Sequence, residues 1–172
     1  MPEDAHRQLS RAVLERLVAA FPMLLAQRVG LYWPQRREIS LFQLAKRILS
    51  EGGVVALPAV VTRRRPIQFR TWIPGDPLSM GLYGIPFPRD GVIVQPDALI
   101  VPVLGFDPDC HRLGYGDGGY DRTLASARPQ PLAIGVAFDF MRLASIDPLP
   151  HDVALDFIVT ETTIVSRSAT DA

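Results

Sequence analysis

Apolar residues near the start of the chain recur at helical spacing. Between residues 2 and 21 they stand at Leu9, Val13, Leu17 and Ala20. A spacing of three to four places these side chains on one face, so the pattern predicts an amphipathic helix over this segment. Charged residues interrupt the segment throughout, which excludes a signal peptide or a membrane span here.

Short apolar runs follow, rich in β-branched and aromatic residues and bounded by proline, glycine or charged positions. This pattern is typical of buried or half-buried strands. The runs are Arg28–Trp33, Val54–Val61, Ile67–Trp72, Ala98–Phe106, Leu132–Phe138 and Asp156–Glu161. The run from Ile67 to Trp72 alternates in polarity, so we expect one face of that strand to be exposed.

Helical segments separate some of these runs. Ser40 is the expected N-cap of a helix over residues 41–53, which Gly52 or Gly53 ends in a left-handed conformation. A second helix is expected from Tyr120, with Asp121 near its start. Parallel strands need such crossovers and are buried by them. The sequence therefore predicts an α/β fold, a three-layer α/β/α sandwich with a mainly parallel sheet, as a single domain over residues 1–172.

Composition narrows the possible partners. The chain has 172 residues, of which 48% are hydrophobic, and its 18 basic residues balance 18 acidic ones. The chain therefore has no net charge that would attract nucleic acid or an anionic membrane, and we expect small molecules as its ligands. We also expect a monomer. The single cysteine, Cys110, forms no internal disulfide, and no Cys/His spacing resembles a zinc site. These features lead us to expect a cytoplasmic protein.

The stretch "HRLGYGDGGYDRTLA", residues 111–125, concentrates glycine between a predicted strand and a predicted helix. Glycines allow successive backbone N–H groups to converge on an anion, and a helix N-terminus adds positive potential. Arg112 and Arg122 bracket the loop and can donate to phosphate oxygens. Asp121 fits such a site if Mg²⁺ bridges it to phosphates. A plain glycine-rich turn, with Asp121 as a helix cap, is the alternative.

The order of residues in this loop resembles the late motif of the 5-formyltetrahydrofolate cyclo-ligase (methenyltetrahydrofolate synthetase) family, Arg-Leu-Gly-x-Gly-x-Gly-x-Tyr-Asp. It stands here as Arg112, Leu113, Gly114, Tyr115, Gly116, Asp117, Gly118, Gly119, Tyr120 and Asp121. The segments "VGLYWPQRREIS", "YGIPFP", "LIVPVLGFD" and "HDVALDFIVTE" resemble other family segments in the same order. The resemblance covers roughly residues 29–164 and implies the cyclo-ligase fold, which is similar to that of ribose-phosphate isomerases.

The resemblance also implies an activity. Family members use ATP to convert 5-formyltetrahydrofolate to 5,10-methenyltetrahydrofolate, releasing ADP and phosphate. By motif match, residues 112–120 hold the ATP phosphates, with Arg112, Tyr120 and Arg122 as catalytic residues. The match assigns Mg²⁺ to Asp121 and Asp152. It places Trp33 and Glu38 against the folate.

Structural roles are open for several of these residues. Glu38 could favour the start of a helix, Asp152 could cap the segment that follows it, and Trp33 could be a core aromatic. The run Arg63–Arg65 is interpreted as a solvated turn, although it could meet an anionic tail of the substrate. Cys110 is expected to be inert beside the loop.

The chain departs from the family pattern at Phe87, Gly119 and Met141. A basic Lys-x-x-Leu-Arg segment, which contributes to the family's ATP site, is not matched in this sequence, so we expect weak ATP use. A diverged relative that binds folate or nucleotide with little turnover is therefore a second hypothesis. A third is another phosphate-binding enzyme, such as a sugar-phosphate isomerase, but its acid–base chemistry would favour a catalytic lysine, and Lys46 lies in a predicted helix.

Overall fold

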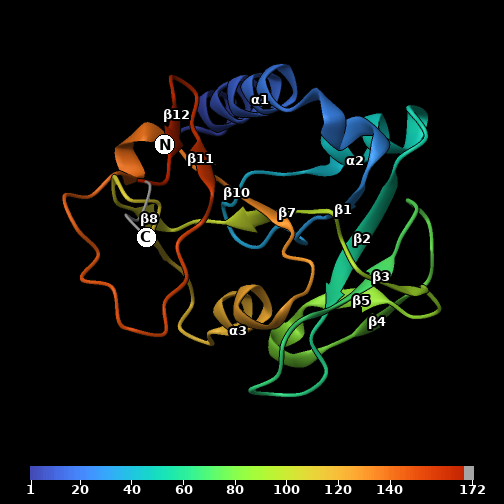
Figure 1. Ribbon diagram of the computed structural model, residues 1–172. Helices are drawn as coiled ribbons and strands as arrows, with labels where there is room; N and C mark the ends of the chain where they lie inside the picture. The colour runs from blue at the N-terminus through green and yellow to red at the C-terminus, as the bar shows by residue number, and fades with distance from the viewer. Residues whose placement is uncertain (169–172) are drawn as a thin grey trace.

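A central sheet forms the middle layer of the protein in the computed structural model (Figure 1), which describes residues 1–168. The last four residues of the predicted domain, 169–172, lie outside the described part. The sheet has eight strands in the order β12-β11-β10-β7-β1-β2-β3-β6. Its inner neighbours, from β11 through β2, are parallel, whereas β12, β3 and β6 pair antiparallel at the two edges.

The helices are α1 (Glu3–Ala20), α2 (Phe42–Ser50) and α3 (Gly119–Ser126), with 3-10 turns η1 (Pro22–Ala26), η2 (Leu82–Gly84) and η3 (Asp139–Met141). The sheet strands are β1 (Arg28–Gly30), β2 (Val54–Ala59), β3 (Gln68–Thr71), β6 (Ile93–Val94), β7 (Ala98–Pro102), β10 (Leu132–Val136), β11 (Phe157–Val159) and β12 (Ile164–Ser166). Two small ribbons pair β4 (Leu78–Met80) with β5 (Pro86–Pro88), and β8 (Gly105–Phe106) with β9 (Arg112–Leu113).

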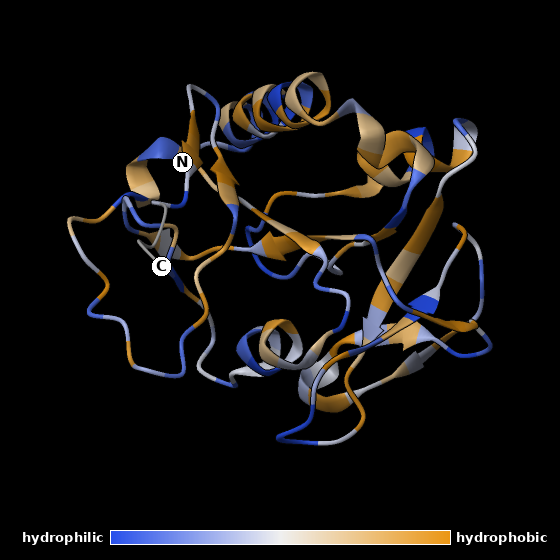
Figure 2. Ribbon diagram, in the orientation of Figure 1, coloured by the Kyte–Doolittle hydropathy of each residue, from blue (hydrophilic) through white to orange (hydrophobic). Residues whose placement is uncertain are grey.

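Helices cover both faces of the sheet. Helices α1 and α2 lie over one face and α3 lies over the other (Figure 1). Each face has its own core, and Figure 2 shows hydrophobic residues concentrated in the central strands between them. Val13, Leu17 and Ile48 are buried on the first face, and Leu124 packs on the second. The predicted three-layer α/β/α sandwich is confirmed.

The predicted first helix and the core of each predicted strand are confirmed, but several boundaries differ. Strand β1 ends at Gly30, where a Cβ would stand 2.6 Å from the Leu99 side chain, so only glycine fits between the neighbouring strands. The prediction that Ser40 is the N-cap of α2 is wrong, because Leu41 occupies that position. Gly52 does follow the helix in a left-handed conformation, with φ of 90°.

Strand β11, buried at Ile158 and Val159, offers a direct test of the second core. Ile158 has no exposed surface and belongs to the same core cluster as Leu124 of α3. We expect Ile158→Val to lower the free energy of unfolding by about 1 kcal/mol, because one buried methyl group is lost. Urea denaturation measures this change. Ile93→Val, at a 59% exposed position, is the control and should leave the midpoint unchanged; equal losses in both variants would contradict the proposed packing.

Candidate active site

The glycine-rich loop lies between β9 and α3, beyond the carboxyl end of β7. This edge is where open α/β sheets bind ligands, because loops and helix N-termini meet there. Gly116 and Gly118 have φ of 88° and 73°, in the left-handed region that other residues avoid. Gly118 is also the N-cap of α3. The predicted order of strand, loop and helix is therefore confirmed.

Arg112 lies beneath this loop. Its guanidinium stands 5.1 Å from the centre of the Tyr120 ring, and Nη1 donates to the Pro102 carbonyl over 3.3 Å. A Cβ on Gly114 would overlap the same guanidinium, so glycine here lets the loop pass over Arg112 in the position that its side chain holds. Burial lowers the pKa of Arg112, while the nearby Tyr120, Asp121 and Asp152 act in the opposite direction.

Arg112 takes part in none of the ion pairs formed by residues 1–168. Arg112 is half-buried, and a cation partly removed from water is normally paired, since leaving it without a counter-charge is costly. The remaining N–H groups of Arg112 can therefore serve an anionic ligand. Burial also raises the pKa of the Tyr120 hydroxyl, so this phenol stays protonated and can donate a hydrogen bond.

The two predicted metal ligands lie close to each other. Oδ1 of Asp121 accepts the backbone N–H of Val153 over 2.9 Å, which brings the residue next to Asp152 against α3. Oδ2 of Asp152 accepts the N–H of Leu149 over 2.8 Å and fixes that turn. Mg²⁺ takes one or two protein carboxylates and completes its shell with water and phosphate oxygens. Residues 1–168 bring together no group of three or more His, Cys, Asp or Glu side chains that could hold a metal, so Asp121 and Asp152 are the pair that could hold Mg²⁺ beside the loop.

Arg122 is partly neutralised within the loop. Its Nη2 lies 3.4 Å from Oδ2 of Asp117, and its Nε donates to the Arg65 carbonyl over 3.4 Å. The other oxygen of Asp117 accepts the Tyr83 hydroxyl over 2.8 Å. That bond to a carboxylate raises the pKa of Tyr83. Tyr83 was missed by sequence reasoning, because no spacing rule connects it to residue 117.

Glu38 faces the same loop from the other side. Its Oε2 accepts the backbone N–H of Gln35 over 3.0 Å, and its Oε1 accepts the Tyr115 hydroxyl over 2.9 Å. Burial and this bond raise the pKa of Tyr115. Glu38 therefore orders its own turn and contacts the glycine-rich loop. It does not begin α2, which starts only at Phe42.

Trp33 belongs to an aromatic cluster. Its ring lies 5.3 Å from that of Phe42 and 6.2 Å from that of Trp72, both nearly perpendicular to it. These contacts account for Trp33 as a partly buried core residue. Its contact with a pterin stays a prediction.

The positions that depart from the family pattern have local explanations. A Cβ on Gly119 would stand 3.3 Å from the Ile67 side chain, so Ile67 occupies part of the space a larger residue would need. The Phe87 ring is buried beneath the Arg70 guanidinium, 5.0 Å from its centre. Met141 packs against both cores.

Cys110 lies two residues before Arg112, the first residue of the glycine-rich motif. The surroundings of its thiol indicate how reactive it is. The residue is buried, its Sγ donates to the Val165 carbonyl over 3.5 Å, and burial raises the pKa of its thiol to about 11. Below that pH the thiol stays protonated, so we expect iodoacetamide to leave the folded protein unmodified at pH 8. Mass spectrometry measures this, with urea-unfolded protein as the reactive control. Rapid alkylation of the folded protein would contradict the expectation.

No helix in residues 1–168 combines the length and apolar character needed to span a membrane.

Comparison with known proteins extends this picture. The chain matches the 5-formyltetrahydrofolate cyclo-ligase family over residues 1–161. It is 33% identical over 138 residues to the 5-formyltetrahydrofolate cyclo-ligase of Mycolicibacterium smegmatis, covering 75% of this chain and 71% of that protein. A shorter match to the cyclo-ligase of Mycoplasma pneumoniae has 39% identity over 67 residues, covering 39% of this chain and 40% of that protein.

A solved structure agrees with these relatives. The NMR structure of Aquifex aeolicus 5,10-methenyltetrahydrofolate synthetase superposes with a TM-score of 0.83 at 29% identity, covering 100% of this chain and 88% of that one. The family match in sequence and the superposition of the fold thus both extend over nearly the whole chain. This protein therefore belongs to the 5-formyltetrahydrofolate cyclo-ligase family, which is a family of enzymes.

Proposed function

We propose that this protein converts 5-formyltetrahydrofolate to 5,10-methenyltetrahydrofolate, consuming ATP in the presence of Mg²⁺ and releasing ADP and phosphate. Family membership supports the reaction class. The observation that carries the ATP part is Arg112, a half-buried guanidinium beneath a glycine-rich loop that has no ion-pair partner among residues 1–168. A polyphosphate is the ligand chemistry that such a group recognises best.

The reaction requires a poor leaving group to be activated. The γ-phosphoryl group of ATP passes to the formyl oxygen of the folate, and ADP leaves. N10 of the folate then attacks the activated formyl carbon and loses its proton. Phosphate departs with the former formyl oxygen, which leaves a methenyl bridge between N5 and N10. Positioning and charge neutralisation supply most of the catalysis in phosphoryl transfer.

Each part of the loop has a role in this scheme. Backbone N–H groups around Gly116 and Gly118 surround the phosphates, and Arg112 donates to their oxygens from below. The protonated Tyr120 hydroxyl is placed to donate a further hydrogen bond. Asp121 and Asp152 would hold Mg²⁺, which neutralises charge on the transferring phosphoryl group when bound.

Glu38 has the chemistry to orient the folate. A carboxylate accepts hydrogen bonds from the N–H donors of a pterin and repels phosphate. The folate would therefore bind on the side of the loop that carries Glu38, and the ATP phosphates would bind away from it. Tyr115 joins the two sides because its hydroxyl bonds Glu38 while its backbone belongs to the loop. The folate and the terminal phosphate of ATP can thereby meet beside Tyr115.

The test incubates purified protein with 5-formyltetrahydrofolate, ATP and Mg²⁺, and follows the methenyl product by absorbance and phosphate by a colorimetric assay. We expect one phosphate for each methenyl group formed, and no product when ATP or Mg²⁺ is omitted. Binding of both substrates without product would contradict the proposal and favour the hypothesis of a binding protein.

A further inference from the structure

One residue of the glycine-rich loop opposes the ligand that the loop is proposed to hold. Asp117 stands between Gly116 and Gly118, the two loop glycines with positive φ. Backbone N–H groups around these glycines favour an anion, whereas the neighbouring carboxylate of Asp117 repels one. The contacts of this carboxylate determine what an ATP phosphate must replace.

The Asp117 carboxylate has partners of the kind that bind a phosphate. Its Oδ2 lies 3.4 Å from Nη2 of Arg122, and its Oδ1 accepts the Tyr83 hydroxyl over 2.8 Å. Oδ2 also lies 3.3 Å from the point at which a Cβ on Gly119, the first residue of α3, would stand. An arginine, a hydroxyl group and a helix N-terminus all stabilise an anion. Asp117 therefore supplies an anion from within the chain to groups that could serve a ligand.

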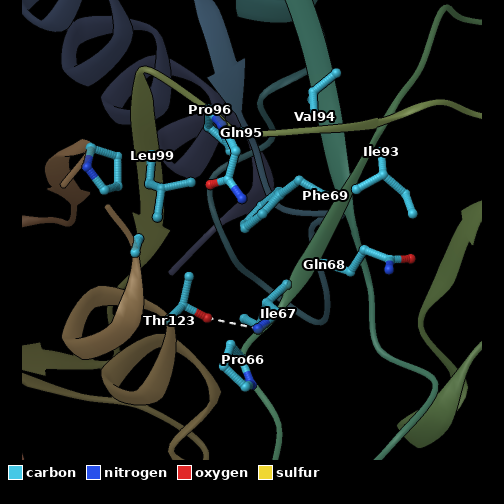
Figure 3. A pocket seen from close by; sticks show the side chains of 12 residues that line it. Pro66, Ile67, Gln68, Phe69, Ile93, Val94, Gln95, Pro96, Leu99 and Thr123 are labelled. Atoms are coloured by element: carbon cyan, nitrogen blue, oxygen red, sulfur yellow. Dashed lines mark hydrogen bonds between the residues drawn. The ribbon is translucent and has the colours of Figure 1, made fainter. Parts of the chain in front are cut away.

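Arg122 is fixed beside the loop by contacts that do not involve Asp117. Its Nε donates to the Arg65 carbonyl over 3.4 Å. The turn between β2 and β3, which carries Arg65, is itself held against α3, because the Ile67 N–H donates to Oγ1 of Thr123 over 2.7 Å. Figure 3 shows this bond, with Thr123 pointing from the helix toward Ile67. The Arg122 guanidinium would therefore stay at the loop if its Nη2 changed partners.

The ion pair between Arg122 and Asp117 is open to exchange. Both side chains reach solvent, with exposed fractions of 31% and 37%. Ion pairs at such positions are weak, because water and salt screen them. Nη1 of Arg122 lies 3.0 Å from the point at which a Cβ on Gly118 would stand, so the guanidinium borders the backbone proposed to surround the phosphates. A polyphosphate carries more charge than a carboxylate and can accept two parallel N–H bonds from arginine, so it is the stronger partner.

A displaced carboxylate has space beside the loop. Asp117 lines a cavity of about 210 Å³, whose walls include Thr62 and Arg65 of the β2–β3 turn. Rotation of the Asp117 side chain can therefore break its pairing with Arg122 without movement of the sheet or of α3.

We propose that Asp117 competes with the ATP phosphates for Arg122. In the free protein the carboxylate pairs with the Arg122 guanidinium, and on nucleotide binding the phosphates take its place. Asp117 thereby sets the affinity for ATP, and it lowers that affinity. This inference rests on the proposed function and limits the part of Asp117 in phosphate binding to its backbone. It also distinguishes Arg122 from Arg112, which forms no ion pair within residues 1–168 and so has none to give up.

The experiment measures nucleotide affinity by titration calorimetry with Mg²⁺ present. We expect Asp117→Asn to lower the Kd for ATP about tenfold, because Arg122 becomes available for a charge-assisted hydrogen bond to phosphate. The Kd for 5-formyltetrahydrofolate should stay unchanged. Asparagine keeps an oxygen that can accept the Tyr83 hydroxyl, so the loop should retain that contact. Asp117→Glu keeps the negative charge and should bring no gain in ATP affinity.

Two further variants isolate the contribution of Arg122. Asp97→Asn is the matched control, because Asp97 also pairs with an arginine, Arg28, over 3.1 Å, and its side chain is 36% exposed. This pair lies at the amino ends of β1 and β7, on the edge of the sheet away from the loop, so the Kd for ATP should not change. In an Arg122→Gln background, Asp117→Asn should lose most of its gain, because no guanidinium is left to release.

The other outcomes overturn the inference. An unchanged Kd for ATP in Asp117→Asn would show that the carboxylate does not compete with phosphate, and a higher one would indicate that it supports the loop or Mg²⁺. A full gain in the Arg122→Gln background would assign the effect to simple repulsion. An equal gain for 5-formyltetrahydrofolate, or in Asp97→Asn, would place the effect outside phosphate binding. If neither the unaltered protein nor Asp117→Asn binds ATP, the proposed function falls together with the inference, whereas the other results affect the inference alone.

Discussion

Asp121→Asn is expected to lower the rate of methenyl formation about 100-fold, the size of effect seen when one preorganised electrostatic group is removed from an active site. The amide oxygen of asparagine can still accept the Val153 N–H that Asp121 binds over 2.9 Å, so the fold around the loop should persist. The negative charge available to Mg²⁺ is lost. The affinity for ATP with Mg²⁺ should fall, and the affinity for 5-formyltetrahydrofolate should stay unchanged.

A second carboxylate in the neighbouring segment provides the control for this variant. Asp156 accepts the Ala133 N–H over 2.8 Å and pairs with Arg167, at the beginning of β11 and away from the loop. Asp156→Asn should keep full turnover. Steady-state kinetics and calorimetry on both variants give the answer. Unchanged turnover in Asp121→Asn would remove Asp121 from the proposed metal site.

Glu38→Gln is expected to weaken binding of 5-formyltetrahydrofolate about tenfold to a hundredfold, because hydrogen bonds to a charged group contribute about 1.5–3 kcal/mol each. Glutamine keeps an oxygen that can accept the Gln35 N–H, so the turn before α2 should remain ordered. The affinity for ATP with Mg²⁺ should not change, since a carboxylate on the folate side does not contact phosphate. The two variants thus affect opposite substrates.

This opposition separates a binding effect from a loss of stability. A destabilised protein would bind both substrates less well and would unfold at lower temperature, so thermal midpoints are measured alongside the affinities. Glu51→Gln, at the exposed end of α2, serves as the control for charge. If folate affinity is intact in Glu38→Gln, the role of Glu38 is limited to ordering its turn and bonding Tyr115.

The central layers of the fold could be predicted because they depend on local patterns. Buried parallel strands such as β7 and β10 are continuous apolar runs in the sequence. Helix α1 is marked by apolar residues at a spacing of three to four. The edges could not be predicted in the same way. Strand β6 is two residues long and half-exposed, and the β4–β5 ribbon contains prolines, so neither carries a periodic signal. Pairing with neighbours distant in sequence creates them.

By itself, the sequence determined the glycine-rich loop and its place between a strand and a helix. Glycine is favoured where φ is positive, as at Gly116 and Gly118, and where the backbone passes close over Arg112, as at Gly114, so the motif can be recognised from the spacing of its glycines. The residues in that spacing also led to the proposal of an anion site with a carboxylate at its margin. The sequence also supplied both predicted carboxylates, Asp121 and Asp152.

Only the tertiary structure decided which distant groups meet at the loop. Glu38 reaches Tyr115 across 77 positions, Tyr83 reaches Asp117 across 34, and the Arg65 carbonyl reaches Arg122 across 57. These contacts leave no periodic trace, because each joins two loops whose separation along the chain is set by the strands and helices between them. The sheet brings the ends of its strands to one edge, and that convergence places Glu38, Tyr83 and the Arg65 carbonyl against the glycine-rich loop.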